Sequence, residues 1–299
     1  MNYFVSWTHS DPLYQTFLPT ARVLVSPPSV NQVWKATNWS APPAALIIDS
    51  GAFQYHKEGR TMHPETVLTR QLQMAEGLTI PTGICHLDVP MLGTRNTAEL
   101  DRRITRNLTH ARWLMDYIVT HGLPPHIYPL GVIQGYTVER IYVVGRMLAE
   151  MGYTTFALGS LAGMVASSRD ELLRRVEAAM EAVGSNLHIL GVSSVTVLPE
   201  IARTGVASID SGAPIHEAWR GGIFYSRPFR RYKLPSPHFQ EWRRTYSFSD
   251  ILTEPLPCDC PVCQDDPESV LQLSGKRYIN LRSVHNYYHL LRELDSITR

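Results

Sequence analysis

The sequence lacks several features that would assign its class at once. No apolar run approaches the roughly 20 residues that a helix needs to cross a bilayer, so we expect no membrane association. The N-terminal stretch MNYFVSWTHSDP has neither the basic start nor the apolar core of a secretory signal, and we therefore expect a cytoplasmic protein. A net charge of +1 excludes a globally basic nucleic-acid binder but leaves a local basic patch open. Four cysteines are too few for a disulfide scaffold.

The composition and the hydrophobic pattern are those of a globular α/β protein. The chain has 299 residues, of which 44% are hydrophobic and 18% charged, enough for one large domain or two smaller ones. Apolar, β-branched runs predict strands at 22–26, 44–51, 82–90, 127–135, 154–160, 186–194 and 206–212. Amphipathic stretches predict helices at 64–77, 97–121, 137–151, 168–184 and 195–203. The alternation indicates parallel strands joined by crossover helices.

Polar residues stand where the predicted strands end. In a (β/α)8 barrel the C-terminal strand ends converge on one mouth, whereas an open, doubly wound sheet gathers only the residues beside its switch point. We therefore predict a TIM barrel at residues 1–249, with a small appended segment and a C-terminal helix at residues 250–299. The polar residues at the strand ends are Asp49, Asp88, Gln134, Ser160, Ser193 and Asp210.

The segment CDCPVC indicates a metal site. Its Cys258, Cys260 and Cys263 can wrap three thiolates around one ion, and His285 on the predicted last helix is the expected fourth ligand. Three sulfurs and an imidazole suit a structural zinc ion with no open position. His289, one helical turn later, is the rival fourth ligand, and buried free cysteines are the alternative to a metal site.

Three aspartates are candidates for chemistry. Asp49 and Asp210 each open an Asp-Ser-Gly turn, and Asp88 follows a third apolar run. Each could simply accept hydrogen bonds in its own turn. Together at one barrel mouth, paired carboxylates can divide attack and proton transfer, which predicts glycoside cleavage or glycosyl exchange. No histidine spacing of a metal hydrolase is present, and His86 and His188 are interpreted as core or rim residues.

Residues 217–244 combine basic and aromatic side chains. A charge run alone usually marks a solvated face, but arginines interleaved with aromatics suit a phosphate backbone and unstacked bases. The candidate nucleic-acid contacts are Arg220, Arg227, Arg230, Arg231, Lys233, Arg243 and Arg244.

The order and spacing of these motifs resemble the tRNA-guanine transglycosylase superfamily, zinc-bearing TIM barrels that exchange guanine for a 7-deazaguanine base. The resemblance runs from Asp49 to the end, through DSGAFQ, HLDVP, GVIQG, ALGSLAG, HILGVSS, SIDSGAP and CDCPVC followed by HN. It implies Asp210 as the nucleophile that forms a covalent glycosyl intermediate and Asp49 as the general acid/base. The implied base-binding residues are Ser50, Phe53, Asp88, Gln134, Gly135, Gly159, Ser160 and Leu161.

Departures from the tRNA enzymes favour a second polymer. Gly51-Ala52 replaces the usual Gly-Gly, the continuation after SIDSGAP differs, and the chain is shorter than typical bacterial members. These features look more like the DNA-modifying, DpdA-like transglycosylases, so DNA is the expected partner and tRNA the alternative, with 7-cyano-7-deazaguanine as one candidate base. A barrel N-glycoside hydrolase and a non-catalytic binding subunit are the other hypotheses. The resemblance further implies a homodimer, and a duplex substrate leaves room for a helper protein that opens it.

Overall fold

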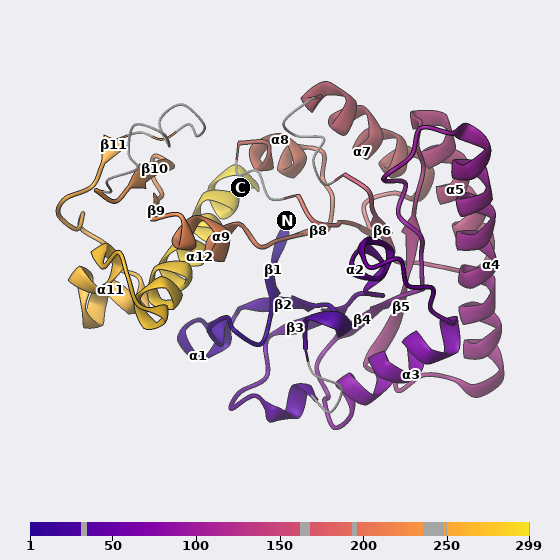
Figure 1. Cartoon of the computed structure of the whole chain (residues 1–299), viewed down its shortest axis with the longest axis horizontal. Helices are drawn as coiled ribbons and strands as arrows, with labels where there is room; N and C mark the ends of the chain where they lie inside the picture. Colours follow the sequence, from indigo (N-terminus) through magenta and orange to yellow (C-terminus); the bar gives the residue numbers. More distant parts are fainter. Residues whose placement is uncertain (31–34, 162–167, 193–195, 236–247, 249, 299) are drawn as a thin grey trace. The chain divides into compact units, whose positions relative to one another are not determined.

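The computed structural model describes residues 1–299 except 31–34, 162–167, 193–195, 236–247, 249 and 299. Its larger compact unit, residues 1–9 and 21–211, is a closed barrel of parallel strands (Figure 1). The predicted (β/α)8 TIM barrel is therefore confirmed. Its strands are β1 (Asn2–Trp7), β2 (Arg22–Val25), β3 (Ala45–Ile48), β4 (Thr82–Cys85), β5 (Ile127–Ile133), β6 (Phe156–Leu158), β7 (Leu187–Ile189) and β8 (Ser208–Ser211).

Strand β1 closes the barrel. It pairs with β2 on one side and with β8 on the other, where Phe4 lies opposite Asp210 in the register. The strands predicted from the sequence do not include NYFVSW, although its apolar and aromatic residues have strong strand propensity. Without β1 the remaining strands would leave two unpaired edges, so this segment decides between a barrel and an open sheet.

The crossover helices are α2 (Ala52–Lys57), α3 (Pro64–Ala75), α4 (Thr97–His121), α5 (Val138–Glu150), α7 (Arg169–Val183) and α8 (Leu198–Arg203). Their ends follow local sequence signals: Asn96 caps α4 by accepting from the Glu99 amide, and Gly122 ends it with φ of 73°. The start predicted for the last of these helices, at residue 195, lies outside the described residues, as does Ser193. Among the residues that the structure describes, no helix is long and apolar enough to cross a membrane.

The barrel interior is apolar below the mouth. Alternate residues of the strands form one buried cluster, and Cys85 is 1% exposed within it, in agreement with a packing role. The cluster consists of Phe4, Leu24, Ala45, Ile47, Cys85, Leu130, Val132 and Ala157. Asp49 and Asp88 follow their strands beyond this cluster, at the end of the barrel where active sites of this fold lie.

The second compact unit comprises residues 10–20 and 212–299. It contains α1 (Tyr14–Phe17), α9 (Ala213–Trp219), a sheet of β9 (Gly222–Tyr225), β10 (Arg230–Lys233) and β11 (Asp250–Ile251), then α11 (Pro261–Asp265) and α12 (Lys276–Thr298). The predicted domain boundary at 249/250 falls inside this unit, whose compact part begins at residue 212. The reason is that α9 and β9 pack on α12, far along the chain.

One polar face of α12 binds these elements together. The fully buried guanidinium of Arg282 donates to the carbonyls of Ala218, Val270 and Gln272 at 2.8–3.1 Å, and burial lowers its pKa to about 10. Asn286, one turn later, accepts from the Phe224 amide at 2.8 Å and donates to the Gly222 carbonyl at 3.0 Å. Buried polar side chains that bond to backbone groups in this way fix the register of the helix as well as its contacts.

Candidate active site and metal centre

The three candidate aspartates lie together at the C-terminal ends of the barrel strands. Asp49 follows β3 directly, Asp88 follows β4, and Asp210 lies within β8. The charges of Asp210 and Asp88 both act on Asp49, raising its pKa. The structure therefore brings into one site the acids that the sequence places at separate strand ends.

Asp49 stands in an environment that favours its protonated form. Burial raises its pKa to about 7, and the charges of the two neighbouring acids act in the same direction. Hydrogen bonds from Ser26 and from the Gly51 amide, the latter at 2.8 Å, partly offset this rise. Beneath it, the buried amide of Gln71 donates to the carbonyls of Ile48, Asp49 and Cys85 and so fixes the ends of β3 and β4. A carboxyl group that titrates near neutrality can both give and take a proton.

Asp210 is held by three hydrogen-bond donors. Its Oδ2 accepts from the Ser6 hydroxyl at 2.7 Å, and its Oδ1 accepts from the Gly191 amide at 2.8 Å and contacts Nε2 of His188 at 3.2 Å. Donors on both oxygens fix the orientation of this carboxylate. The two Asp-Ser-Gly aspartates thus have different surroundings.

Asp88 belongs to a network of polar side chains across β3, β5 and β6. It accepts from Ser50 at 2.7 Å and from the Gln134 amide at 2.6 Å, while the Gln134 carbonyl accepts from Ser160 at 2.6 Å. The Met91 amide completes the chain by donating to the Ser160 hydroxyl at 2.8 Å. Burial raises the pKa of Asp88 against these hydrogen bonds. Four of the predicted base-binding residues are therefore in direct contact.

The remaining predicted base-binding residues surround this network. A Cβ on Gly159 would lie 2.4 Å from Nε2 of Gln134, and one on Gly135 would lie 2.7 Å from Ile141, so a side chain at either position would force its neighbour to move. Ser160 has φ of 59°, and Leu161 is fully buried. Phe53 on α2 is 59% exposed, an unusual exposure for a phenylalanine at a barrel mouth. A cavity of about 250 Å³ borders Asp88.

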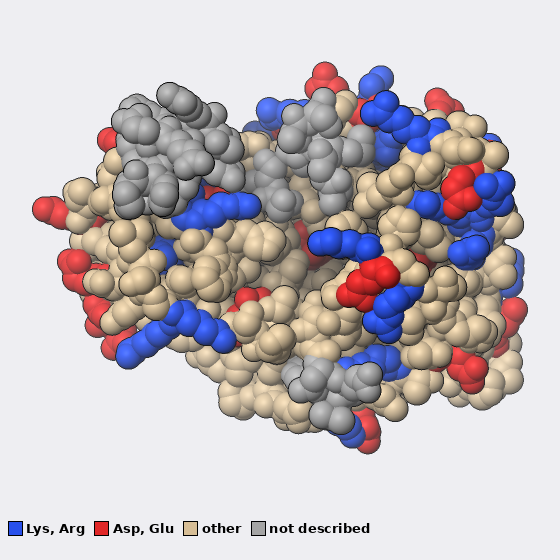
Figure 2. Space-filling model, in the orientation of Figure 1, with Lys and Arg blue, Asp and Glu red and all other residues tan. Residues whose placement is uncertain are grey.

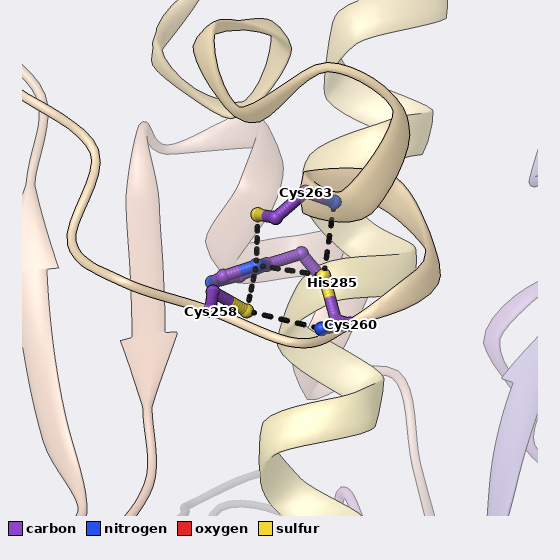
Figure 3. A group of neighbouring side chains, drawn as sticks. All are labelled: Cys258, Cys260, Cys263 and His285. Carbon is purple, nitrogen blue, oxygen red and sulfur yellow. Dashed lines mark hydrogen bonds between the residues drawn. The ribbon is translucent and has the colours of Figure 1, made fainter.

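The metal centre is formed by the loop before α11, by α11 itself and by α12 (Figure 3). The sulfurs of Cys258, Cys260 and Cys263 and Nδ1 of His285 all lie within 4.8 Å of one another. Nδ1 is 3.3 Å from the sulfurs of Cys260 and Cys263 and 3.8 Å from that of Cys258. A tetrahedral zinc with Zn–S of about 2.3 Å and Zn–N of about 2.0 Å has S···N edges of about 3.5 Å, so the donor set fits zinc.

His289, the rival ligand, takes a different place. Its Nδ1 accepts from the Ser226 amide at 3.0 Å, so its proton is on Nε2, which lies 3.2 Å from the sulfur of Cys258. His285 instead turns Nε2 to the Phe224 carbonyl at 2.8 Å and leaves Nδ1 facing the sulfurs. This is the usual way in which a second hydrogen bond fixes the tautomer of a metal-ligating histidine.

The basic segment is only partly available to a polymer. Lys233 is 1% exposed, with Nζ 3.4 Å from Glu217, and Arg231 pairs with the same carboxylate at 3.0 Å. Arg220, Arg227 and Arg230 are exposed, whereas Arg243 and Arg244 lie outside the described residues. Over the barrel, the face drawn in Figure 2 shows basic and acidic side chains intermixed.

Comparison with known proteins assigns the chain. The queuine tRNA-ribosyltransferase family matches residues 29–299, which include the three aspartates and the metal centre. The chain belongs to this family. A tRNA-guanine(15) transglycosylase of Pyrobaculum aerophilum is 25% identical over 274 residues. That alignment covers 88% of this chain and 49% of the relative, so the chain spans about half the length of the curated relative that it matches.

Three contacts of the acids lie outside the predicted site. Ser6 in β1 and Ser26 after β2 bind Asp210 and Asp49, and His188 in β7 contacts Asp210. The two serines come from the first part of the chain, which carries no motif. A hydroxyl directly after the apolar run of β2 is the one signal that could have indicated Ser26.

Proposed function

We propose that the protein exchanges a guanine in a nucleic acid for a 7-deazaguanine base by double displacement. The observation that carries this is the division of environments between the two aspartates. Asp49 is protonated and deprotonated near neutral pH, while Asp210 is held as a carboxylate acceptor by three donors. One acid is thus suited to proton transfer and the other to attack at a sugar carbon.

The proposed reaction consists of two displacements at C1′, with Asp210 as the nucleophile and Asp49 as the proton carrier. A carboxylate oxygen of Asp210 attacks the ribosyl or deoxyribosyl C1′, the C1′–N9 bond breaks, and its electron pair leaves with guanine, which takes a proton from Asp49. The incoming base then gives its N9 proton to Asp49, N9 attacks C1′, and the bond to Asp210 breaks. Two inversions retain the configuration at C1′. Asp88 and Gln134 would bind the edge of the base with their free acceptor and donor positions.

The zinc centre would be structural in this function. Three thiolates and one imidazole complete a tetrahedron and leave no open position for substrate. When bound, the ion would cross-link α11 and the segment before it to α12. Cys258, Cys260, Cys263 and His285 would hold it.

Two polymers are candidate substrates. tRNA is favoured by the family match and by the name of the relative. DNA is favoured by Gly51-Ala52 at the start of α2, where the resemblance to the tRNA enzymes departs from their Gly-Gly. In either polymer a paired guanine must leave its stack before C1′ can be reached, at a cost of a few kcal/mol. The phosphates of the polymer would be contacted by the exposed arginines, Arg220, Arg227 and Arg230.

The test is incorporation of labelled 7-cyano-7-deazaguanine into tRNA, single-stranded DNA and duplex DNA, assayed side by side. We expect one of these polymers to accept the label and to release one guanine for each base incorporated. Asp210→Asn should abolish both while keeping its melting temperature and zinc content. Guanine release without incorporation would instead show a hydrolase, and binding without either product a non-catalytic subunit.

A further inference from the structure

We propose that His188 is the positioning residue of the nucleophile. Its ring forms hydrogen bonds with both Ser208 and Asp210 and so fixes the carboxylate for attack. This inference rests on the proposed function. It concerns a side chain that the sequence pattern leaves among the core residues. Its role would be to act through Asp210 and not on the substrate itself.

The geometry is that of a three-residue chain on two paired strands. His188 on β7 lies opposite Ser208 in the register with β8, two residues before Asp210. Its Nδ1 is 2.8 Å from the Ser208 hydroxyl and its Nε2 is 3.2 Å from Oδ1 of Asp210. The imidazole is 2% exposed, and the ring of Phe4 packs edge-on against it at 5.6 Å.

The hydrogen bond at the Asp210 end of this chain has a fixed direction. A carboxylate can only accept, so Nε2 of His188 carries the proton and donates it to Asp210. Nδ1, at the other side of the ring, shares a hydrogen bond of 2.8 Å with the hydroxyl of Ser208. Oδ1 of Asp210 receives a second donor, the Gly191 amide, and is anchored from two directions. The carboxylate is therefore oriented before substrate arrives.

Hydrogen bonds at both nitrogens hold the orientation of this ring. A cavity of about 330 Å³ at the foot of the barrel is lined by both His188 and Ser208. Side chains beside a cavity lack contact atoms on one side and can turn. Ser208 supplies the bond that prevents the imidazole from turning away from Asp210.

The barrel contains a matched histidine without this contact. His86 on the segment after β4 is also 2% exposed, but its Nδ1 accepts from the Val132 amide at 3.2 Å and its ring packs near Tyr153. Replacing it removes a buried imidazole from the same barrel and leaves Asp210 untouched. His86→Leu is therefore the control for loss of packing.

The experiment measures single-turnover formation of the covalent adduct and, separately, the KM for the nucleic acid. We expect His188→Leu to slow adduct formation by about tenfold or more with KM within about threefold, because one donor to the nucleophile is lost. His188→Gln, whose amide can donate in the same place, should restore most of the rate. Ser208→Ala should cause a smaller loss that disappears in a His188→Leu background, because Ser208 acts only through the ring.

Each outcome decides between the hypotheses. Folded His188→Leu that forms the adduct at the wild-type rate overturns the inference, as does an equal loss in His86→Leu, which would mean packing alone. His188→Gln as slow as His188→Leu also contradicts it. Asp210→Asn is measured alongside: if that variant exchanges bases, the proposed function itself fails, whereas an inactive Asp210→Asn with unimpaired His188→Leu rejects only the role of His188.

Discussion

Gln134 donates a hydrogen bond of 2.6 Å to the carboxylate of Asp88, although the two residues follow different strands of the barrel. Because the Gln134 carbonyl is already occupied by the Ser160 hydroxyl, the amide cannot flip without breaking both contacts. The pair therefore has a fixed polarity, with an acceptor on Asp88 and a donor on Gln134. A guanine-like base, which carries donors at N1 and N2 and an acceptor at O6, would match this polarity.

The first prediction concerns Asp88→Asn. The substitution replaces an acceptor by an amide whose protons would face the donors of Ser50 and Gln134. We expect kcat/KM for base exchange to fall by about 100-fold or more, since a buried donor is left unpaired in each orientation of the amide. The kcat/KM for the base is measured by varying its concentration at saturating nucleic acid. Ser50→Ala, which removes one donor and adds none, should cost less, and an equal loss would argue that Asp88 only supports the turn.

The second prediction uses the two half-reactions to assign Asp49. Its pKa of about 7 means that the protonated form declines above neutral pH. Adduct formation needs the acid form, so its rate should fall about tenfold per pH unit above pH 7. Resolution of the adduct by the incoming base needs the carboxylate, so its rate should fall in the same proportion below pH 7.

Rapid-quench measurements of each half-reaction between pH 5 and 9 test this assignment. Asp49→Asn should lose both limbs, whereas Asp210→Asn should form no adduct at any pH. If the two half-reactions shared one pH dependence, or if Asp49→Asn kept both limbs, the roles of the two aspartates would have to be revised. An exchange of these roles is the outcome that the experiment is designed to detect.

The third prediction separates the two histidines of α12. His285→Ala removes one of the four zinc ligands, so we expect the variant to lose zinc. We also expect residues 212–299 to lose their cooperative unfolding transition. His289→Ala removes the donor to the sulfur of Cys258 and the acceptor of the Ser226 amide, but no metal ligand. It should therefore keep one zinc per chain and release it to a chelator about 10- to 100-fold more readily. Metal analysis and chelator titration check both. A zinc-free His289→Ala together with a zinc-loaded His285→Ala would reverse the assignment.

Much of the barrel could be predicted from the sequence because strand and helix periodicities alternate and because polar residues follow the strands. The same logic placed Asp49, Asp88 and Gln134 at one mouth. Strand β1 was missed because a single apolar run of six residues at the start of a chain has no partner pattern around it. Its Ser6 was missed with it, since an isolated hydroxyl carries no periodic signal.

Contacts between distant parts of the chain could not be predicted from local pattern. Lys233 stands in a basic, aromatic segment and looks like a phosphate ligand, yet it is buried against Glu217, sixteen residues before it. Likewise, the second unit begins at residue 212 because Arg282 and Asn286 bind backbone groups near residues 214–224. Long-range pairing of this kind depends on the fold and not on nearby residues.

The last prediction concerns Gly159→Ala. The backbone at Gly159 can accept an alanine, but its Cβ would lie 2.4 Å from Nε2 of Gln134, which is 3% exposed and bound at both ends. Gln134 must therefore move and give up Asp88 or Ser160. We expect kcat/KM to fall at least about tenfold, with a modest fall in melting temperature, because one hydrogen bond and not a core layer is lost.

Gly145→Ala provides the matched control. Its Cβ would lie 2.8 Å from that of Ala182, where α5 packs on α7, away from the three aspartates. Overpacking there should destabilise the fold by about 1–3 kcal/mol and leave kcat/KM unchanged. We thus expect Gly159→Ala to lower kcat/KM with a modest fall in melting temperature, and Gly145→Ala to lower the melting temperature with kcat/KM unchanged. Equal loss of activity in both would mean that crowding acts through stability, and that the orientation of Gln134 does not determine recognition of the base.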